Sequence, residues 1–160
     1  MTKIMDHIIS SFNDLIDIGQ DGQKGYRLAA KKEKDRDLKL LFNRFADQKA
    51  QLVAELRNEF LKLDGNPERF GAPPVSSLRA QIFTKTIAAE DFSEDIITEC
   101  EREEGNTLHA YRSVLEIENL PPDLHHVVER QYTQVKRAYD KISQLKRKNL
   151  IKEDDVDPLN

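Results

Sequence analysis

The sequence predicts an all-α protein in which four long helices form an antiparallel bundle, with a long crossover connection that contains a short extra helix. Three observations support this prediction. Four segments carry apolar residues at helical spacing, and turn signals separate them. The connection between the second and third segments is much longer than the other two. Short connections make each pair of neighbours an antiparallel hairpin, and one long crossover joins the two hairpins.

The composition fits a single soluble domain with a full core. The chain has 160 residues, of which 34% are charged and 38% apolar, and its formal net charge is -4. This charge gives no indication of a nucleic-acid partner. No apolar run approaches the ~20 residues that a membrane span needs, and the N-terminus lacks a signal-peptide pattern. The single cysteine, Cys100, excludes an internal disulfide framework. We therefore expect a cytoplasmic protein with no membrane or nucleic-acid partner.

The first helix is predicted over residues 4–32, and it contains three glycines within two turns. Gly19, Gly22 and Gly25 each cost roughly 1 kcal/mol relative to alanine in a helix interior. They are expected where another helix or a ligand approaches closely. A break in the helix is the alternative interpretation.

The second helix is predicted to begin after Asp35 or Asp37, either of which can cap it, and to end near residue 63. The stretch 64–67, Asp-Gly-Asn-Pro, is a typical helix stop. Within the crossover, Ser76 or Ser77 is expected to cap a short helix over residues 78–89. The expected apolar side of that helix consists of Leu78, Ile82, Phe83 and Ile87.

The third helix is predicted over residues 93–118 with Ser93 as its cap, and the fourth over residues 122–148 after a turn that contains two prolines. Residues 149–160 are acidic and poor in apolar side chains, so we expect a disordered tail. The predicted domain organisation is therefore a bundle at 1–148 and a tail at 149–160.

Each long segment has polar residues where its apolar stripe should continue. The interruptions are Gly19, Gln20 and Gln23 in the first segment, Gln48 and Lys49 in the second, Glu101 and Glu104 in the third, and Gln131 in the fourth. We expect a buried polar layer near mid-height that consists of Gln20, Gln23, Gln48, Glu104 and Gln131. Glu104 is expected to bond to Gln131 or Gln48.

Three functions of this layer are open. It can be a hydrogen-bonded network that only fixes the register of the helices. It can bind a metal, for which Glu101 and Glu104 are the best ligands, with iron or manganese as the cofactor. It can also hold a carboxylate of raised pKa for acid–base work or for a small ligand. A bundle di-metal site needs two Glu-x-x-His motifs, and no histidine lies at the layer, so we expect no cofactor. Cys100 is expected to be a buried structural thiol.

Several blocks occur in a characteristic order along residues 8 to 147. They are Asn13-Asp14-Leu15-Ile16, Asp21-Gly22-x-x-Gly25-Tyr26-Arg27-x-Ala29-Ala30, Gln48-x-x-Gln51-x-x-x-Glu55-Leu56, Glu99-Cys100-Glu101-Arg102-x-Glu104, and Leu120-Pro121-Pro122-Asp123-Leu124 to Glu129-Arg130-Gln131-Tyr132. In these blocks the chain resembles the uncharacterised bacterial four-helix-bundle proteins of the ferritin-like superfamily, a domain-of-unknown-function family.

The resemblance implies a ferritin-like bundle and no particular reaction. Two departures concern the layer. The family often has a histidine where this chain has Tyr139, and a Gly-Glu-Asp sequence where this chain has Glu103-Glu104-Gly105. The first departure removes a nitrogen ligand, and the second moves charge around the layer. Both make a metal centre less expected here.

We therefore expect a non-enzymatic soluble bundle that acts by self-association or by binding an unidentified partner protein. A role in the response to stress is part of this expectation. The alternative is a degenerate ferritin-like di-metal oxidase or peroxidase, or a metal-binding protein, that uses Glu101 and Glu104. A homodimer is expected because the second helix is apolar over a wide face. That face is Phe42, Phe45, Leu52, Val53, Leu56 and Phe60, extended by Ile82 and Phe83. Coverage of this face by the crossover helix is the competing interpretation.

Overall fold

A computed structural model describes residues 2–64 and 81–155, with side chains over 5–62 and 81–148. The described residues form helices only, which confirms the all-α prediction. They are α1 (Thr2–Lys32), α2 (Arg36–Asp64), α4 (Ile82–Ala89), α5 (Ser93–Leu115) and α6 (Pro122–Asp155). None of these helices is long and apolar enough to cross a membrane.

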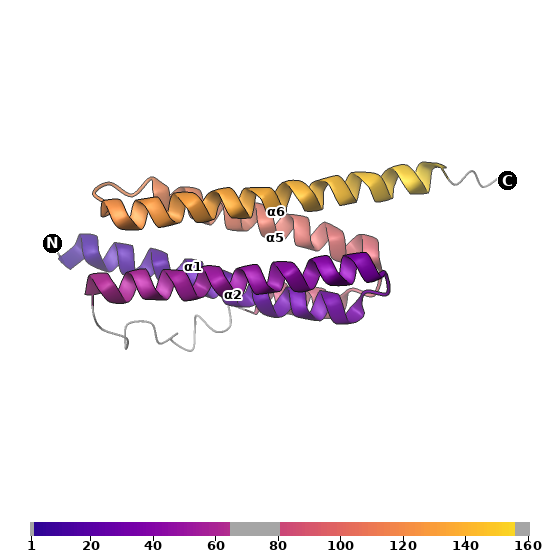
Figure 1. Cartoon of the computed structure of the whole chain (residues 1–160), viewed down its shortest axis with the longest axis horizontal. Helices are drawn as coiled ribbons and strands as arrows, with labels where there is room; N and C mark the ends of the chain where they lie inside the picture. Colours follow the sequence, from indigo (N-terminus) through magenta and orange to yellow (C-terminus); the bar gives the residue numbers. More distant parts are fainter. Residues whose placement is uncertain (1, 65–80, 156–160) are drawn as a thin grey trace.

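The four long helices lie side by side as two hairpins, α1 with α2 and α5 with α6 (Figure 1). Because α6 is antiparallel to both α2 and α5, these two helices run in the same direction (Figure 1). The end of α2 and the start of α5 therefore lie at opposite ends of the bundle, as a long connection between them predicts. The last turns of α6 extend beyond the ends of the other helices (Figure 1).

The helix boundaries confirm some of the predicted caps and correct others. Asp35 caps α2, because its Oδ1 accepts a hydrogen bond from the backbone N–H of Leu38 at 3.1 Å. The prediction that Ser93 caps α5 is wrong. Phe92 occupies the cap position without a side-chain bond, and the Ser93 hydroxyl instead donates to Oε1 of Glu33 at 2.9 Å. The start of α5 is thereby tied to the turn between α1 and α2.

Two further boundaries differ from the prediction. The short helix begins at Ile82 with Gln81 as its N-cap residue, whereas a start at Leu78 was expected from the pattern; Ser76, Ser77 and Leu78 lie outside the described residues. Ile82 is 60% exposed rather than part of the apolar side. Helix α5 ends at Leu115 and not at 118.

Helix α6 continues past Lys148 to Asp155, so the predicted end at residue 148 is too early. The division into a bundle at 1–148 and a tail at 149–160 stays a prediction.

The three glycines of α1 mark close approaches, as expected, and the helix is unbroken. A Cβ atom at Gly19 would lie 2.5 Å from Val53 Cγ2, and one at Gly25 would lie 2.2 Å from a ring carbon of Phe83. Both distances are below any normal contact, so α2 and α4 can pack on α1 only because these positions lack a side chain.

Helix α4 is held at both ends by side chains of α1. The carboxylate of Asp21 accepts hydrogen bonds from the backbone N–H groups of Phe83 (2.8 Å) and Thr84 (2.9 Å) at the start of α4. The ammonium of Lys32 donates to the carbonyls of Ile87 (3.0 Å) and Ala88 (2.7 Å) at its end. An anion at the N-terminus and a cation at the C-terminus both complement the helix dipole. The crossover helix therefore lies along α1 in the same direction.

The core consists of two apolar clusters. One contains Ile8 to Ile16 of α1 and Leu52 to Phe60 of α2. The other contains Tyr26 to Ala30 of α1 and Phe42 to Ala46 of α2. Each is completed by residues of α5 and α6. In α1, α2 and α5, the buried polar side chains of Asp21, Lys49 and Glu104 lie between the two clusters along the chain.

The apolar face of α2 that we expected at a dimer interface belongs to this core. Its six residues, together with Phe83 of α4, are all buried within one subunit. This surface is therefore unavailable to a second chain. Helix α1 packs along α2, whereas α4 packs mainly on α1, so coverage of this face by the crossover helix is not confirmed. The homodimer itself stays a prediction.

Candidate functional site

Two separate clusters of polar side chains join the long helices in the interior, and the first is centred on Glu104 of α5. The hydroxyl of Tyr26, from α1, donates to Glu104 Oε1 at 2.6 Å. The ammonium of Lys49, from α2, lies 2.9 Å from Glu104 Oε2. The side chains of Lys49 and Glu104 are 3% and 0% exposed, and Tyr26 is fully buried. We call Tyr26, Lys49 and Glu104 the lysine cluster.

A glycine gives Lys49 the room to reach Glu104. The position of a Cβ at Gly22 lies 3.3 to 3.5 Å from the Cγ, Cδ and Cε atoms of Lys49. The alkyl chain of the lysine therefore packs directly on α1 while its charge stays in the core. The lysine cluster thus joins α1, α2 and α5. Lys49 forms an ion pair with the Glu104 carboxylate, and Tyr26 donates a hydrogen bond to the same carboxylate.

The electrostatics around Glu104 do not favour acid–base or nucleophilic chemistry at the Tyr26 phenol or the Cys100 thiol. Burial, and then the negative charge of Glu104, raise the pKa of the Tyr26 phenol well above its usual value. The same two causes raise the pKa of the fully buried Cys100 thiol. Both groups therefore remain protonated near neutral pH, and Cys100 has the features of a structural thiol rather than a nucleophile.

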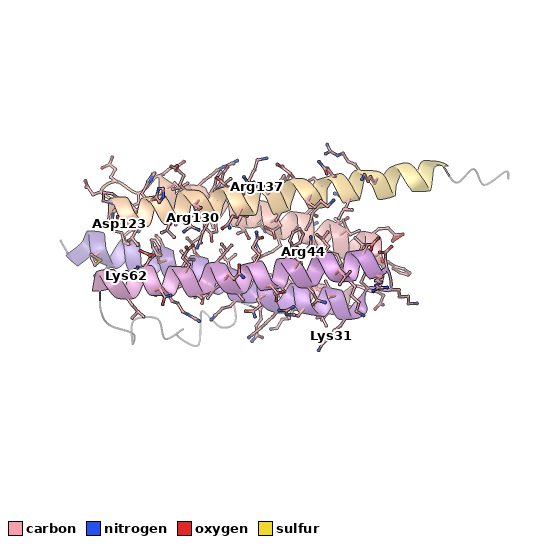
Figure 2. The ribbon with its side chains drawn as sticks, in the orientation of Figure 1. Lys31, Arg44, Lys62, Asp123, Arg130 and Arg137 are labelled. Atoms are coloured by element: carbon pink, nitrogen blue, oxygen red, sulfur yellow. The ribbon has the colours of Figure 1, made fainter. Side chains whose placement is uncertain are left out.

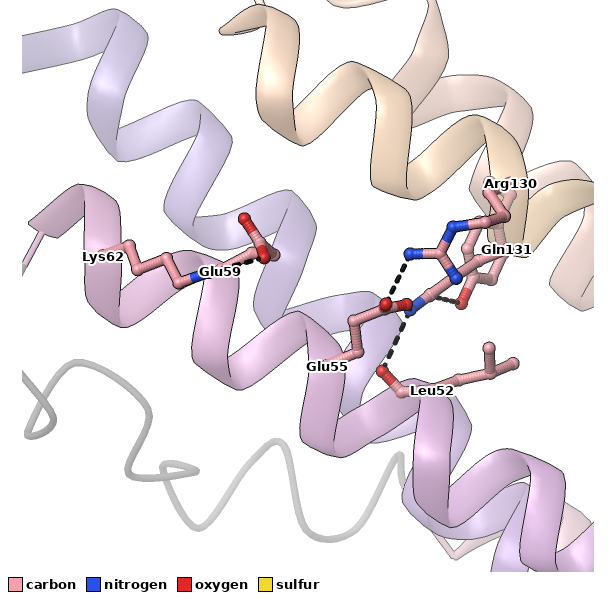
Figure 3. A network of polar contacts seen from close by, with 7 residues as sticks. Leu52, Glu55, Glu59, Lys62, Arg130 and Gln131 are labelled. Carbon is pink, nitrogen blue, oxygen red and sulfur yellow. Dashed lines mark hydrogen bonds and ion pairs between the residues drawn. The ribbon is translucent and has the colours of Figure 1, made fainter.

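The second cluster, which we call the glutamine cluster, consists of Glu55, Tyr111, Arg130 and Gln131. The Tyr111 hydroxyl donates to Gln131 Oε1 at 2.7 Å. The Gln131 amide nitrogen donates to Glu55 Oε1 at 2.7 Å and to the carbonyl of Leu52 at 3.2 Å. Glu55 also forms an ion pair with Arg130. Figure 3 shows this chain of contacts running from the interior of the bundle to Arg130.

The structure brings together only part of the polar layer predicted from the sequence. Glu104 and Gln131 are both fully buried, but their hydrogen bonds go to different clusters, so the expected bond from Glu104 to Gln131 or Gln48 is absent from the described contacts. Gln20, Gln23 and Gln48 are half-buried. Gln48 Oε1 is buried without a hydrogen-bond partner in the described part of the chain.

Five members of the two clusters do not belong to the layer predicted from the sequence: Tyr26, Lys49, Glu55, Tyr111 and Arg130. Lys49 carried a signal, because it interrupts the apolar stripe of α2. The two tyrosines read as ordinary members of apolar stripes, although a buried phenol needs a hydrogen-bond acceptor. Glu55 carried no signal beyond its place in the block Gln48 to Leu56.

The two residues proposed as metal ligands point to different cations. Glu101 Oε1 lies 3.0 Å from the ammonium of Lys146 on α6, and Glu104 pairs with Lys49 on α2. Across residues 2–64 and 81–155, no group of three or more His, Cys, Asp or Glu side chains has a geometry that could hold a metal ion.

An acidic cavity of about 440 Å³ lies between α1 and α5, next to the lysine cluster. Asp14, Asp17, Asp21, Glu103 and His109 are among its lining residues. Burial, and then the charge of Asp21, raise the pKa of Glu103 to about 8. Glu103 is therefore mostly protonated at neutral pH.

A match to one known protein family covers most of the residues described above. A family model described as a domain of unknown function (DUF2383) matches residues 7–117. This range contains all of α2, α4 and α5 and most of α1, and therefore the whole lysine cluster. Helix α6, with Arg130 and Gln131, lies outside it. No curated protein matches the chain.

Proposed function

Because the chain belongs to the DUF2383 family, whose function is unknown, we propose its role from the geometry of its core: it is a non-catalytic, cytoplasmic helical bundle of ferritin-like type that acts by associating with itself or with a partner protein. In this proposal the lysine cluster stands where a metal-binding bundle carries its ions, and the ammonium of Lys49 supplies the positive charge. The resemblance of the sequence blocks and the parallel course of α2 and α5 support the ferritin-like assignment.

One observation carries the proposal: both oxygens of Glu104 are occupied by protein groups. Tyr26 donates to Oε1 and Lys49 to Oε2, at 2.6 and 2.9 Å. A metal ion or a substrate would have to displace a buried ammonium from its counter-ion, and a buried charge left without a partner is strongly unfavourable. The lysine cluster thus has the features of a closed structural element.

The rival function is a degenerate di-metal oxidase or peroxidase, or a metal-binding protein, that binds iron or manganese through Glu101 and Glu104. These residues lie one turn apart on α5, which is the spacing that favours a shared ion. Their separate lysine partners argue against it, because each carboxylate is already neutralised by a different helix.

Metal analysis separates the two functions. The protein is purified without chelator, exposed to Fe²⁺, Mn²⁺ or Zn²⁺, and desalted before its metal content is measured. We expect substoichiometric metal in the natural protein and in Glu104→Ala alike. A stoichiometric ion that disappears in Glu104→Ala, but persists in the matched variant Glu55→Ala of the glutamine cluster, would overturn the proposal in favour of the rival.

A further inference from the structure

A shallow groove lies between the beginning of α2 and the second half of α6. It has a volume of about 290 Å³, and Leu38 and Leu41 of α2 and Leu145 of α6 contribute apolar walls. Leu38 and Leu41 pack beneath it on the second apolar cluster of the core. Leu40, also at the groove, is 54% exposed, which is unusual for a large apolar side chain in this protein. The groove is thus an apolar surface that continues from the core to the exterior.

Charged residues flank this surface in a regular pattern along α2. Asp37, Leu40, Leu41 and Arg44 all line the groove, and their spacing of three, four and seven residues places them on one face of the helix. Asp37 and Arg44 are exposed, and none of the ion pairs among the described residues includes either of them. Figure 2 shows Arg44 on the edge of α2 next to α6.

We propose that this face of α2 binds the same face of a second copy of the chain in an antiparallel, two-fold symmetric dimer. This inference rests on the self-association part of the proposed function. The two-fold axis passes between Leu40 and Leu41, so that Leu40 of each copy meets Leu41 of the other. The same axis places Asp37 of each copy opposite Arg44 of the other, because the two residues are equally distant from the midpoint.

The order of charges favours a second copy over an unrelated partner. A two-fold interface uses one patch twice, so the patch must be complementary to itself. An anion one turn before the apolar pair and a cation one turn after it meet this requirement, and Lys141 on the α6 side of the groove adds a second cation. A parallel pairing would instead bring Asp37 against Asp37 and Arg44 against Arg44, which is repulsive.

The interface is expected to be weak. It is centred on two turns of one helix and one apolar groove, which is below the size of interfaces that keep dimers together at low concentration. We therefore expect a concentration-dependent equilibrium with a dissociation constant of about 10 to 100 µM, equivalent to roughly 6 kcal/mol.

Sedimentation equilibrium and light scattering across this concentration range test the interface by charge exchange. Asp37→Arg and Arg44→Asp each create two like-charge contacts across the axis, so each single variant is expected to weaken dimerisation by at least about tenfold, which is 1.4 kcal/mol. The double variant Asp37→Arg with Arg44→Asp restores opposite charges and is expected to recover the dimer. Circular dichroism checks the fold of every variant. Asp123→Arg, at the start of α6 and well separated from Arg44 along the bundle (Figure 2), makes the same charge change as Asp37→Arg and serves as a control that should dimerise like the natural protein.

Three results would overturn the interface. A dimer that persists in both single variants would place the contact elsewhere and leave self-association intact. A double variant that stays monomeric while folded would exclude the charge pairing. A natural protein that is monomeric throughout the range would remove self-association itself, leaving partner binding as the remaining part of the proposed function. The metal analysis above is independent of all three.

Discussion

The lysine cluster and the glutamine cluster share one kind of contact, a hydrogen bond from a buried tyrosine, but differ in where their charged side chains lie. In each, a buried tyrosine donates to a side-chain oxygen, Tyr26 to Glu104 at 2.6 Å and Tyr111 to Gln131 at 2.7 Å. The acceptor in the lysine cluster is a carboxylate, and it is balanced in the core by Lys49. The acceptor in the glutamine cluster is a neutral amide, and its charged members lie at the partly exposed pair of Glu55 and Arg130.

This difference shows what each kind of polar group needs in order to be buried in the bundle. A buried amide or hydroxyl needs only hydrogen-bond partners, which the glutamine cluster provides while leaving its charges near water. A buried charge needs a counter-charge as well, and the lysine cluster provides it from another helix. The lysine cluster should therefore be far more sensitive to the loss of one member.

The largest expected effect follows from breaking the ion pair of the lysine cluster. Lys49→Met keeps an unbranched side chain that is one atom shorter but leaves Glu104 buried without a cation, so we expect a loss of about 3 to 5 kcal/mol in the free energy of unfolding. Gln131→Leu, the matched change in the glutamine cluster, removes hydrogen bonds but leaves no buried charge without a counter-ion, so it should cost about 1 to 3 kcal/mol. Urea denaturation measures both.

A double variant tells charge imbalance apart from lost packing. Lys49→Met with Glu104→Leu removes both charges, and we expect it to recover most of the stability lost in Lys49→Met. If the double variant is no more stable than the single one, the loss comes from packing and the electrostatic account of the lysine cluster is wrong.

The two tyrosines give a smaller and closely matched comparison. Tyr26→Phe removes a hydrogen bond to a charged oxygen and should cost about 1.5 to 3 kcal/mol, whereas Tyr111→Phe removes one to a neutral amide and should cost about 1 kcal/mol. Both changes keep the ring, so packing is nearly constant. Equal losses by urea denaturation would mean that the charge of Glu104 adds nothing to its bond with Tyr26.

The sequence predicted the helices well because each depends on local signals. Apolar spacing marked the four long helices, and Asp35 and the glycines of α1 marked a cap and the close approaches that the structure contains. Gln131 and Glu104 stood out because each interrupts an apolar stripe. Their burial could be expected from one helix at a time.

The pairing of these residues could not be predicted in the same way, because it depends on contacts between segments that are far apart in the chain. Nothing near Glu104 in the sequence indicates that Lys49 and Tyr26 meet it from two other helices. The same reason explains Asp21, which caps α4 from α1 across more than sixty positions of chain, and Ser93, whose hydroxyl bonds to Glu33 instead of capping its own helix. A local pattern can show that a polar group is buried but not which partner it finds.

The smallest expected effect concerns Glu103, the neighbour of Glu104 in the sequence, which lines the acidic cavity and forms no ion pair with a lysine among the residues that the structure describes. Burial, and then the charges of Asp21 and Glu104, raise its pKa to about 8, although Lys49 acts in the opposite direction. In the unfolded chain its pKa is about 4.3. Between these two values the folded state holds a proton that the unfolded state has released, so stability should fall as the pH rises from about 4.3 to 8 and then level off. Glu103→Gln cannot titrate, and its melting temperature should therefore decline less than that of the natural protein between about pH 5 and 9. Because Glu103 is only partly buried, the difference should be smaller than the effect of Tyr26→Phe.

The melting temperatures of the two proteins could instead change with pH by the same amount across this range. That result would mean that Glu103 is ionised in the folded state, and that a carboxylate beside the lysine cluster needs no cation of its own.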